Sequence, residues 1–321
     1  MSTFTEFHDE LCSVANDLLA KDREIDWSVL VHAGWTGLEV PESAGGAGAT
    51  FTETALILRQ IGRAAGANHY LGSAALAVAA LQHAPDELLA AVADGSSRFA
   101  VVTDQFDAAS GKVTGRAEFV PDAVDADRLL ILVDGGVAVV PASAVTVSAQ
   151  PVVDETRALA TVSADGAVPE VIVPSDCASA VVDRATVAIA VDSLGIAEQM
   201  LESTVDYVKM RHQFGRPIGS FQAVKHACAD MLVAIEVSRQ LVADAVAAVG
   251  DGADATVPAA MAKSHTCSAA VHIAGKAMQL HGGIGYTWES GIHTYLKRAT
   301  LNRSLFGSPA MQRKRLSQRY H

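Results

Sequence analysis

The chain has 321 residues and a formal net charge of −12, and half of its residues are hydrophobic although only 5% are aromatic. This length allows one large domain or two to three smaller ones, and a composition rich in alanine and poor in aromatic residues favours close-packed helices. The acidic balance argues against a nucleic-acid-binding surface, which needs concentrated basic residues, but a few local arginines could still hold a phosphorylated small ligand.

The sequence contains no signal for a membrane, an export pathway or a metal. No apolar run is long enough to span a bilayer, and the amino terminus lacks the basic and apolar regions of a signal peptide. We therefore expect a cytoplasmic protein without a membrane partner. The cysteines at 12, 177, 228 and 267 are far apart and the histidines form no ligand array, so no metal site is predicted.

Residues 1–98 are predicted to form an amino-terminal helical domain. Leu11, Val14 and Leu18 recur at near-helical spacing along its first segment. A glycine cluster at residues 45–48 could be mistaken for a phosphate-binding loop. Because it follows a proline and has no lysine partner, we interpret it as a turn that connects two helices.

Residues 99–182 have a different pattern and are predicted to form a reduced β-domain. Short runs rich in valine and isoleucine alternate there with Gly, Asp and Pro, which is typical of strands in a small antiparallel sheet or barrel. The runs with the strongest strand pattern are residues 129–133, 137–140, 145–147 and 171–173.

Residues 183–321 are predicted to form a carboxy-terminal helical bundle. Leu194, Ala197 and Leu201 fall on one face of a first long helix. A loop over residues 250–255 separates a second helix from a third helix that runs from residue 258 to 279. Long helices with short connections are typical of an antiparallel bundle.

Two segments of this bundle have side chains that suit a bound dinucleotide. The first reads Arg-His-Gln-Phe-Gly-Arg-Pro-Ile-Gly-Ser-Phe-Gln over residues 211–222. Arg211 offers a bidentate fork for a phosphate, and the backbone at Phe214 can approach a ligand because a glycine follows it. Gln213 and Gln222 can form hydrogen bonds without adding charge.

The second segment reads Gln-Leu-His-Gly-Gly-Ile-Gly-Tyr over residues 279–286. Gly282 and Gly283 allow the chain to turn closely beneath a flat ring or a phosphate, and Gln279 faces the same point. Each segment alone is a weak signal, since a Gly-Gly pair after a helix is usually a cap. Their order on successive helices makes the combination specific.

Together the two segments resemble the flavin-contacting segments of acyl-CoA dehydrogenases. The run Gly-Trp-x-Gly-Leu-x-Val-Pro-Glu-x-x-Gly-Gly at residues 34–46 resembles the amino-terminal domain of the same family. The resemblance implies a mainly α fold with an amino-terminal helical domain, a small central β-barrel and a carboxy-terminal four-helix bundle. It also implies contacts to the FAD of a neighbouring subunit across a dimer interface, made by Arg211, Gln213, Phe214, Gln222, Gln279, Gly282 and Gly283.

The chain departs from the family pattern at the positions that carry the chemistry. Residues 305–308 read Leu-Phe-Gly-Ser where the common pattern is Tyr-Glu-Gly-Thr, so Phe306 replaces the usual glutamate base. Some members carry the base near the position of Ala185, which is not acidic either. A Thr-Glu-Pro-x-x-Gly-Ser-Asp-like loop that contacts the flavin ring is also missing, because residues 102–107 read Val-Thr-Asp-Gln-Phe-Asp. No catalytic residue is therefore assigned to this chain.

These departures resemble the short, non-catalytic subunit of heterotetrameric, steroid-type acyl-CoA dehydrogenases of actinobacteria. That resemblance implies a catalytic acyl-CoA dehydrogenase subunit as partner in an α2β2 assembly. It implies an acyl-CoA substrate, here a bulky sterol-derived CoA ester, which is converted to the α,β-unsaturated product. Electron-transfer flavoprotein is the electron acceptor that the family resemblance implies.

Two alternatives stay open at this point. The first is a homo-oligomeric acyl-CoA dehydrogenase with a relocated base. Asp192 is the candidate, because it lies among Ala, Val and Ile residues and burial would raise the pKa of its carboxyl group. Asp183, beside Arg184, is interpreted instead as an aspartate at a helix start. The second alternative is a flavin-free scaffold that has kept only the fold.

Overall fold

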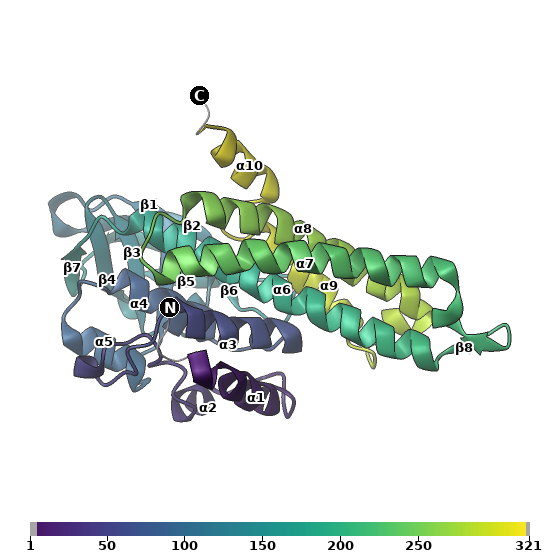
Figure 1. Ribbon diagram of the computed structural model, residues 1–321. Helices are drawn as coiled ribbons and strands as arrows, with labels where there is room; N and C mark the ends of the chain where they lie inside the picture. The colour runs from purple at the N-terminus through teal and green to yellow at the C-terminus, as the bar shows by residue number, and fades with distance from the viewer. Residues whose placement is uncertain (1–4, 319–321) are drawn as a thin grey trace.

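The computed structural model describes residues 5–318 and confirms a mainly helical chain with small sheets in the middle of the sequence (Figure 1). The amino-terminal part is helical, as predicted, and includes a π-helical segment at Leu71–Leu76. Its α-helices are α1 (His8–Leu19), α2 (Trp27–His32), α3 (Phe51–Ala64), α4 (Ala77–Ala80) and α5 (Asp86–Ala93). The glycine cluster at residues 45–48 lies in the connection between α2 and α3, as the sequence predicts.

Helix α3 begins where its sequence offers a capping box. The side chain of Thr50 accepts a hydrogen bond from the backbone N–H of Thr52 at 3.2 Å, and Glu53 accepts one from the backbone N–H of Thr50 at 2.9 Å. These bonds satisfy amide groups that have no partner inside the first turn of a helix. The cap therefore fixes the start of the helix that lies against the bundle.

Two glycines allow α3 to approach the first bundle helix, α6 (Ala178–Met210), very closely. A Cβ atom on Gly62 would lie 2.1 Å from the carbonyl oxygen of Asp192, and a Cβ on Gly195 would lie 2.1 Å from that of Arg59. Any other residue would collide with the opposite backbone at either position. The close approach joins the amino-terminal helices firmly to the bundle.

The strands of the central part of the chain form two sheets. The first has the order β1-β3-β4-β7 and the second β2-β6-β5. Strands β3, β4, β5 and β7 confirm the four predicted runs. The prediction of an antiparallel sheet is wrong for β1, because β1 pairs with β3 in parallel. The bounds are β1 Phe99–Phe106, β2 Val113–Pro121, β3 Arg128–Val133, β4 Gly136–Pro141, β5 Thr146–Gln150, β6 Leu159–Ala167 and β7 Val171–Pro174.

An apolar cluster separate from the main core lies between the sheets and includes Val102, Ile131 and Val162, one from each of β1, β3 and β6. The opposite faces of β1, β3 and β4 contribute Val101, Leu130 and other side chains to the main core, which continues into the helices. Strands buried on both faces have near-continuous apolar runs, which is why β3 and β4 were recognisable in the sequence.

The carboxy-terminal helices form an antiparallel bundle that extends away from the sheets (Figure 1). Besides α6, it contains α7 (Gln222–Gly250), α8 (Thr256–His281) and α9 (Ile292–Ser304), and α10 (Pro309–Ser317) follows. The predicted loop at residues 250–255 is confirmed between α7 and α8. The helix start at Asp183 is wrong, because α6 begins at Ala178 and Asp183 lies buried within it.

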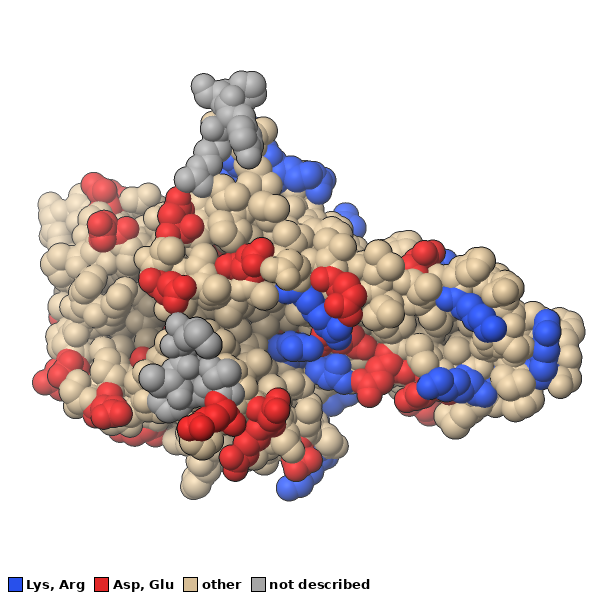
Figure 2. Space-filling view, in the orientation of Figure 1, with Lys and Arg blue, Asp and Glu red and all other residues tan. Residues whose placement is uncertain are grey.

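Charged side chains of both signs gather where the bundle leaves the rest of the molecule (Figure 2). The carboxylate of Glu198 on α6, which is 4% exposed, accepts hydrogen bonds from Arg59 of α3 at 2.6–2.7 Å and from Arg239 of α7 at 2.7 Å. Arg63 lies 3.7 Å from the same carboxylate. One buried glutamate thus ties three helices together.

Among the described residues, no helix is long and apolar enough to cross a membrane.

Candidate functional site

The segment that follows α6 forms a small hairpin at the far end of the bundle, here called the arm (residues 211–222; Figure 1). Its strands are β8 (His212–Gln213) and β9 (Arg216–Pro217). Phe214 at the tip is 90% exposed and has a φ of +52°, a left-handed conformation that is uncommon for a residue with a side chain. Gly215 follows with a φ of +76°, so the turn needs glycine there.

The base of the arm is held by its own aromatic contacts. The rings of Phe214 and Phe221 meet edge to face with centroids 6.1 Å apart, and the guanidinium of Arg216 lies 4.1 Å from the centre of the Phe221 ring. Both contacts are of a kind that stabilises a turn by more than the area it buries. The arm is therefore an ordered element that projects its polar groups into open space.

The polar side chains of the arm that are predicted to bind a ligand are open to solvent. Arg211, Gln213 and Gln222 are all exposed. Within residues 5–318, the guanidinium of Arg211 has no hydrogen-bond or ion-pair partner, although five N–H groups are present to donate. An arginine without a partner beside a turn of this shape suits an incoming phosphate.

The second predicted segment lies where α8 ends. Gly282 has φ +62° and ψ −139°, a combination that is essentially confined to glycine. A Cβ atom on Gly282 or Gly283 would meet nothing within 4 Å, so the backbone there faces open space. Gln279 is exposed, and its Oε1 accepts a hydrogen bond from the Nζ of Lys276 at 2.9 Å.

The structure brings the two segments to the same end of the bundle. The ring of Tyr207, one turn before the arm, stacks on that of His281 with centroids 4.3 Å apart. The Tyr207 hydroxyl also donates a hydrogen bond to the His281 carbonyl at 3.3 Å. The last turns of α6 and α8 are thereby locked to each other, so the two segments that follow them leave the bundle at the same end, here called the tip of the bundle.

The positions that the family uses for chemistry lie at the opposite end. Thr103, near the end of β1, and the segment that includes Phe306 line a single cavity of about 920 Å³, here called the sheet cavity. Val182 in the first turns of α6 lines it as well. Helix α6 has 33 residues and is therefore roughly 50 Å long, so Val182 and Arg211 are roughly 40 Å apart.

Neither family position supplies a base to the sheet cavity. Phe306 lines the cavity with an apolar ring, and Ala185 is fully buried in the main core. Two carboxylates that the sequence analysis did not single out, those of Asp104 and Glu118, do line it. Glu118 is paired with Arg116 at 2.8 Å, and Asp104 is exposed near the end of β1.

The sequence analysis predicts a raised pKa for the carboxyl group of Asp192, and this prediction is wrong, because the pKa is lowered. Burial alone would raise the pKa of this carboxyl group, but the charges of Arg298 and Arg157 and hydrogen bonds from Arg298 and Asn302 lower the pKa to about 2. Arg298 donates to both oxygens, at 3.0 and 2.6 Å, and Asn302 donates at 2.6 Å. A carboxylate held in this way is a structural anion and does not accept a proton near neutral pH.

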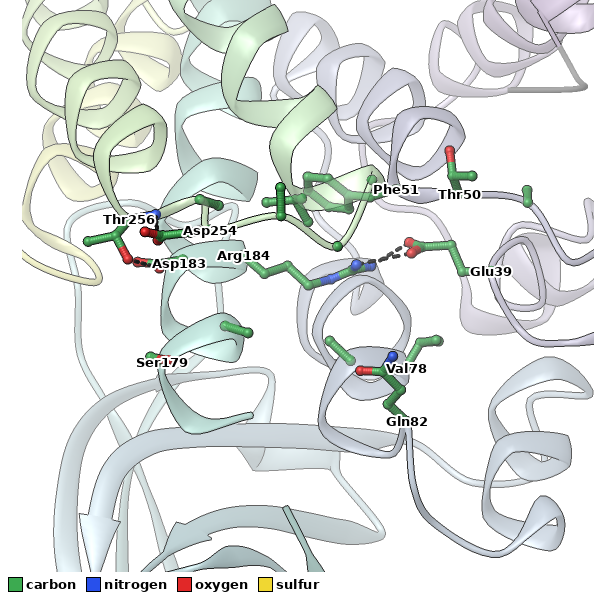
Figure 3. A pocket seen from close by; sticks show the side chains of 18 of the residues that line it. Glu39, Thr50, Phe51, Val78, Gln82, Ser179, Asp183, Arg184, Asp254 and Thr256 are labelled. Carbon is green, nitrogen blue, oxygen red and sulfur yellow. Dashed lines mark hydrogen bonds and ion pairs between the residues drawn. The ribbon is translucent and has the colours of Figure 1, made fainter. Parts of the chain in front are cut away.

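A second cavity, of about 730 Å³, lies between the amino-terminal helices, the start of α6 and the loop between α7 and α8 (Figure 3). The side chain of Arg184 extends along it and forms an ion pair with Glu39, while its Nε donates to the carbonyl of Ala75. Asp183 accepts hydrogen bonds from Thr256 at 3.0 Å and from Arg315 at 2.6 Å. Asp183 is thus a paired interior carboxylate, and these groups already serve the packing of the chain.

The exposed surface at the tip of the bundle fits part of the cofactor that the resemblance implies. The exposed guanidinium of Arg211 and the open backbone at Gly215, Gly282 and Gly283 suit a pyrophosphate, which needs positive charge and close approach of backbone amides. By contrast, among the described residues no group of three or more His, Cys, Asp or Glu side chains could hold a metal ion.

Comparison with known proteins gives the same assignment along nearly the whole chain. Residues 2–91 match the acyl-CoA dehydrogenase N-terminal domain, and residues 177–321 match the acyl-CoA dehydrogenase C-terminal domain. The chain is 36% identical over 306 residues to "Acyl-CoA dehydrogenase IpdE2" of Mycobacterium tuberculosis, covering 93% of this chain and 88% of that protein. The protein of the same name from Mycolicibacterium smegmatis is 33% identical over 90% of this chain and 86% of its own length.

Solved structures agree with the sequence relatives. A variant of the Tcur3481-Tcur3483 steroid ACAD superposes with a TM-score of 0.90 at 27% identity, covering 98% of both chains. The ChsE4-ChsE5 complex from Mycobacterium tuberculosis superposes with a TM-score of 0.88 at 26% identity, covering 99% of this chain and 98% of that one. The chain belongs to the acyl-CoA dehydrogenase family, and it is similar to a chain of a structure called a steroid ACAD and to a chain of the ChsE4-ChsE5 complex.

Proposed function

We propose that this chain is a non-catalytic subunit of an FAD-dependent acyl-CoA dehydrogenase and that its arm holds the FAD of a catalytic partner subunit. Acyl-CoA dehydrogenases are flavoproteins, in which FAD accepts the hydride when bound. In this proposal Arg211, Gln213, Phe214, Gln222, Gln279, Gly282 and Gly283 bind and orient the pyrophosphate and adenosine parts of that cofactor.

The observation that carries the proposal is the separation between the arm and the sheet cavity. An FAD whose ring lay in the sheet cavity of this chain could not reach Arg211, which is roughly 40 Å away along α6. This separation supports a role of the arm toward a cofactor that a neighbouring chain holds. A flavin-free scaffold would have no use for an exposed arginine and three open glycines at one end of the bundle.

The absence of a usable base supports the non-catalytic role. Removal of an α-proton from an acyl thioester requires a carboxylate within hydrogen-bond reach of that carbon. The two family positions are occupied by Phe306 and Ala185, and Asp192 is fixed by Arg298 in a buried ion pair. This pairing removes the candidate on which the homo-oligomeric alternative depended.

The similar structures also support a proposal for the partner and the substrate. Two of the similar structures carry paired names, and one is called a steroid ACAD. We therefore propose an α2β2 assembly with a catalytic acyl-CoA dehydrogenase subunit that converts a bulky, sterol-derived CoA ester to its α,β-unsaturated form. Electron-transfer flavoprotein is proposed as the electron acceptor.

A co-purification experiment tests this function. The chain is purified alone and together with a candidate catalytic subunit, and the visible absorbance of bound flavin is recorded in each case. Flavin colour that appears only after co-expression is the expected result. Flavin bound to the chain alone would instead support the homo-oligomeric enzyme, and a co-purified complex without flavin would support the scaffold.

A further inference from the structure

A histidine and a buried aspartate connect the π-helical segment with the end of β2. His69 lies just before this segment, and its Nδ1 is 3.8 Å from the Oδ1 of Asp122, the residue that follows β2. The Oδ2 of Asp122 accepts a hydrogen bond from the backbone N–H of Gly72 at 2.7 Å. Because Gly72 belongs to the π-helical segment Leu71–Leu76, both oxygens of this carboxylate face the same part of the chain.

The packing leaves little freedom around this carboxylate. Asp122 is 5% exposed and has a φ of +63°, a conformation that is uncommon for a residue with a side chain. A Cβ atom on Gly72 would lie 2.9 Å from the Oδ2 of Asp122, so a larger residue there would displace the carboxylate. The Nδ1 of His69 is buried and has no hydrogen-bond partner among the described residues. The ring nitrogen that faces Asp122 can therefore carry a proton.

The buried charges around Asp122 balance only when a proton is bound. Three carboxylates and two guanidiniums interact there, namely Asp122, Asp154, Asp192, Arg157 and Arg298. They carry one excess negative charge, and a buried charge without compensation is costly. Lys263 of α8 also faces Arg157, but it donates a hydrogen bond to the carbonyl of Asn302, and burial lowers the pKa of its amine. A proton on His69 or Asp122 makes the cluster neutral.

A second carboxylate faces the other side of the His69 ring. The Oδ2 of Asp125 lies 3.6 Å from Nε2, but this side chain is 51% exposed and is therefore hydrated. Burial raises the pKa of Asp122, while His69, the amide of Gly72 and the two arginines oppose the rise. The folded chain thus holds a proton at this carboxylate more tightly than the unfolded chain does.

We propose that His69 and Asp122 share one proton and that this proton is a pH-dependent latch on the π-helical segment. With the proton bound, the cluster is neutral and the pair holds residues 71–76 against the end of β2. When the proton leaves, the excess negative charge weakens this contact and the segment opens locally. The stabilisation is therefore present in acid and is lost as the pH rises above 3.8, the ordinary pKa of an aspartate, through the raised value of the pair.

The latch lies between the two cavities described above. Pro121, just before Asp122, lines the sheet cavity. Val78 and Ala79, just after the π-helical segment, line the cavity along which Arg184 extends. Isolated π-helical turns are frequent at functional sites, since they interrupt the regular hydrogen bonds of a helix. Local opening of this segment changes the walls of both cavities, so the shared proton couples their shape to pH.

Amide hydrogen exchange of the full-length chain, followed by mass spectrometry, measures this opening. We expect the protection factors of residues 71–76, corrected for the intrinsic pH dependence of exchange, to fall at least about tenfold between about pH 5 and about pH 8. Amides of α7 serve as the internal reference and should change less than about twofold. Constant protection of residues 71–76 in the parent chain over this range would overturn the proposal, and this measurement needs no variant.

Two aspartate variants locate the effect. Asp122→Asn keeps an oxygen acceptor for the amide of Gly72 but cannot ionise, so the protection of residues 71–76 should no longer depend on pH. Asp125→Asn, the matched control, removes the exposed carboxylate on the other side of His69 and should retain the dependence of the parent. An unchanged pH dependence in Asp122→Asn, or its equal loss in both variants, would show that the buried pair is not the latch.

Discussion

Arg298 of α9 donates hydrogen bonds to both carboxylate oxygens of Asp192 of α6, at 3.0 Å from Nε and at 2.6 Å from Nη2. Each side chain is 1% exposed. The Nη1 of Arg298 continues the network to Thr156, at 2.8 Å, in the segment just before β6. Arg157, just before β6, also lies 3.1 Å from this carboxylate. Asp192 and its two arginines therefore connect the bundle with the part of the chain that carries the sheets.

Replacement of Asp192 by asparagine should destabilise the chain. It removes the charge that compensates Arg298 and Arg157 and leaves two buried guanidiniums with a neutral partner, which typically costs about 3–5 kcal/mol. Urea unfolding of the purified chain measures the loss. The matched control is Asp206→Asn on the exposed side of the same helix, for which we expect less than about 0.5 kcal/mol. Equal stabilities for the two variants would show that the ion pair contributes nothing.

Acid should weaken the same contact. Because its partners lower the pKa of Asp192 to about 2 from an ordinary value of 3.8, the folded state holds the proton less tightly than the unfolded state does. The pair therefore contributes about 2 kcal/mol above pH 4, and about half of this should be lost by about pH 3. The difference in unfolding free energy between the parent and Asp192→Asn should shrink accordingly between about pH 7 and pH 3. A difference independent of pH would contradict this assignment.

Arg211→Ala should reduce the FAD content of the co-purified complex while leaving the fold intact. The guanidinium is exposed and has no partner among residues 5–318, so its removal should not change the melting temperature of the chain. The lost charge-assisted bonds to phosphate should weaken FAD binding about 10- to 100-fold. Lys209→Ala, an exposed cation one residue before the end of α6, is the control that should keep full occupancy. Full flavin content in Arg211→Ala would refute the role of the arm.

Asp104→Asn tests whether this chain supplies a catalytic base that the sequence analysis did not identify. Asp104 and Glu118 both line the sheet cavity, and Glu118 is paired with Arg116, so Asp104 is the acidic group best placed to act there. Turnover of the complex, per bound flavin, should stay within a few-fold of the parent. Loss of a general base would instead reduce the rate by roughly 10²–10⁴-fold, and such a loss would place the chemistry in this subunit.

Local patterns in the sequence were sufficient for most of the fold. The loop between α7 and α8 and four of the strands were predictable because glycine-rich turns and runs of valine and isoleucine depend on neighbouring residues. Strands β2 and β6 were less visible. Gly115, Arg116 and Glu118 interrupt the apolar pattern of β2, and the parallel pairing of β1 with β3 depends on a contact that no local pattern encodes.

In the candidate sites, too, features that depend on neighbouring residues could be predicted, and features that depend on distant residues could not. The arm was predictable because its residues are contiguous and its glycines have a conformational reason. The partner of Asp192 was not, since Arg298 lies 106 residues away and burial alone suggested a raised pKa. The convergence of Asp104 and Gln312 on one cavity with Phe306 is also a product of tertiary packing. Only the structure could show it.

The central claim is that this chain holds a partner's FAD and none of its own. The most direct measurement is the ratio of released FAD to each subunit in the purified complex, obtained by denaturing the complex and quantifying the flavin and both chains. We predict one FAD for each pair of unlike subunits. Two FAD molecules for each pair would mean that the sheet cavity of this chain also binds flavin, and this result would contradict the account.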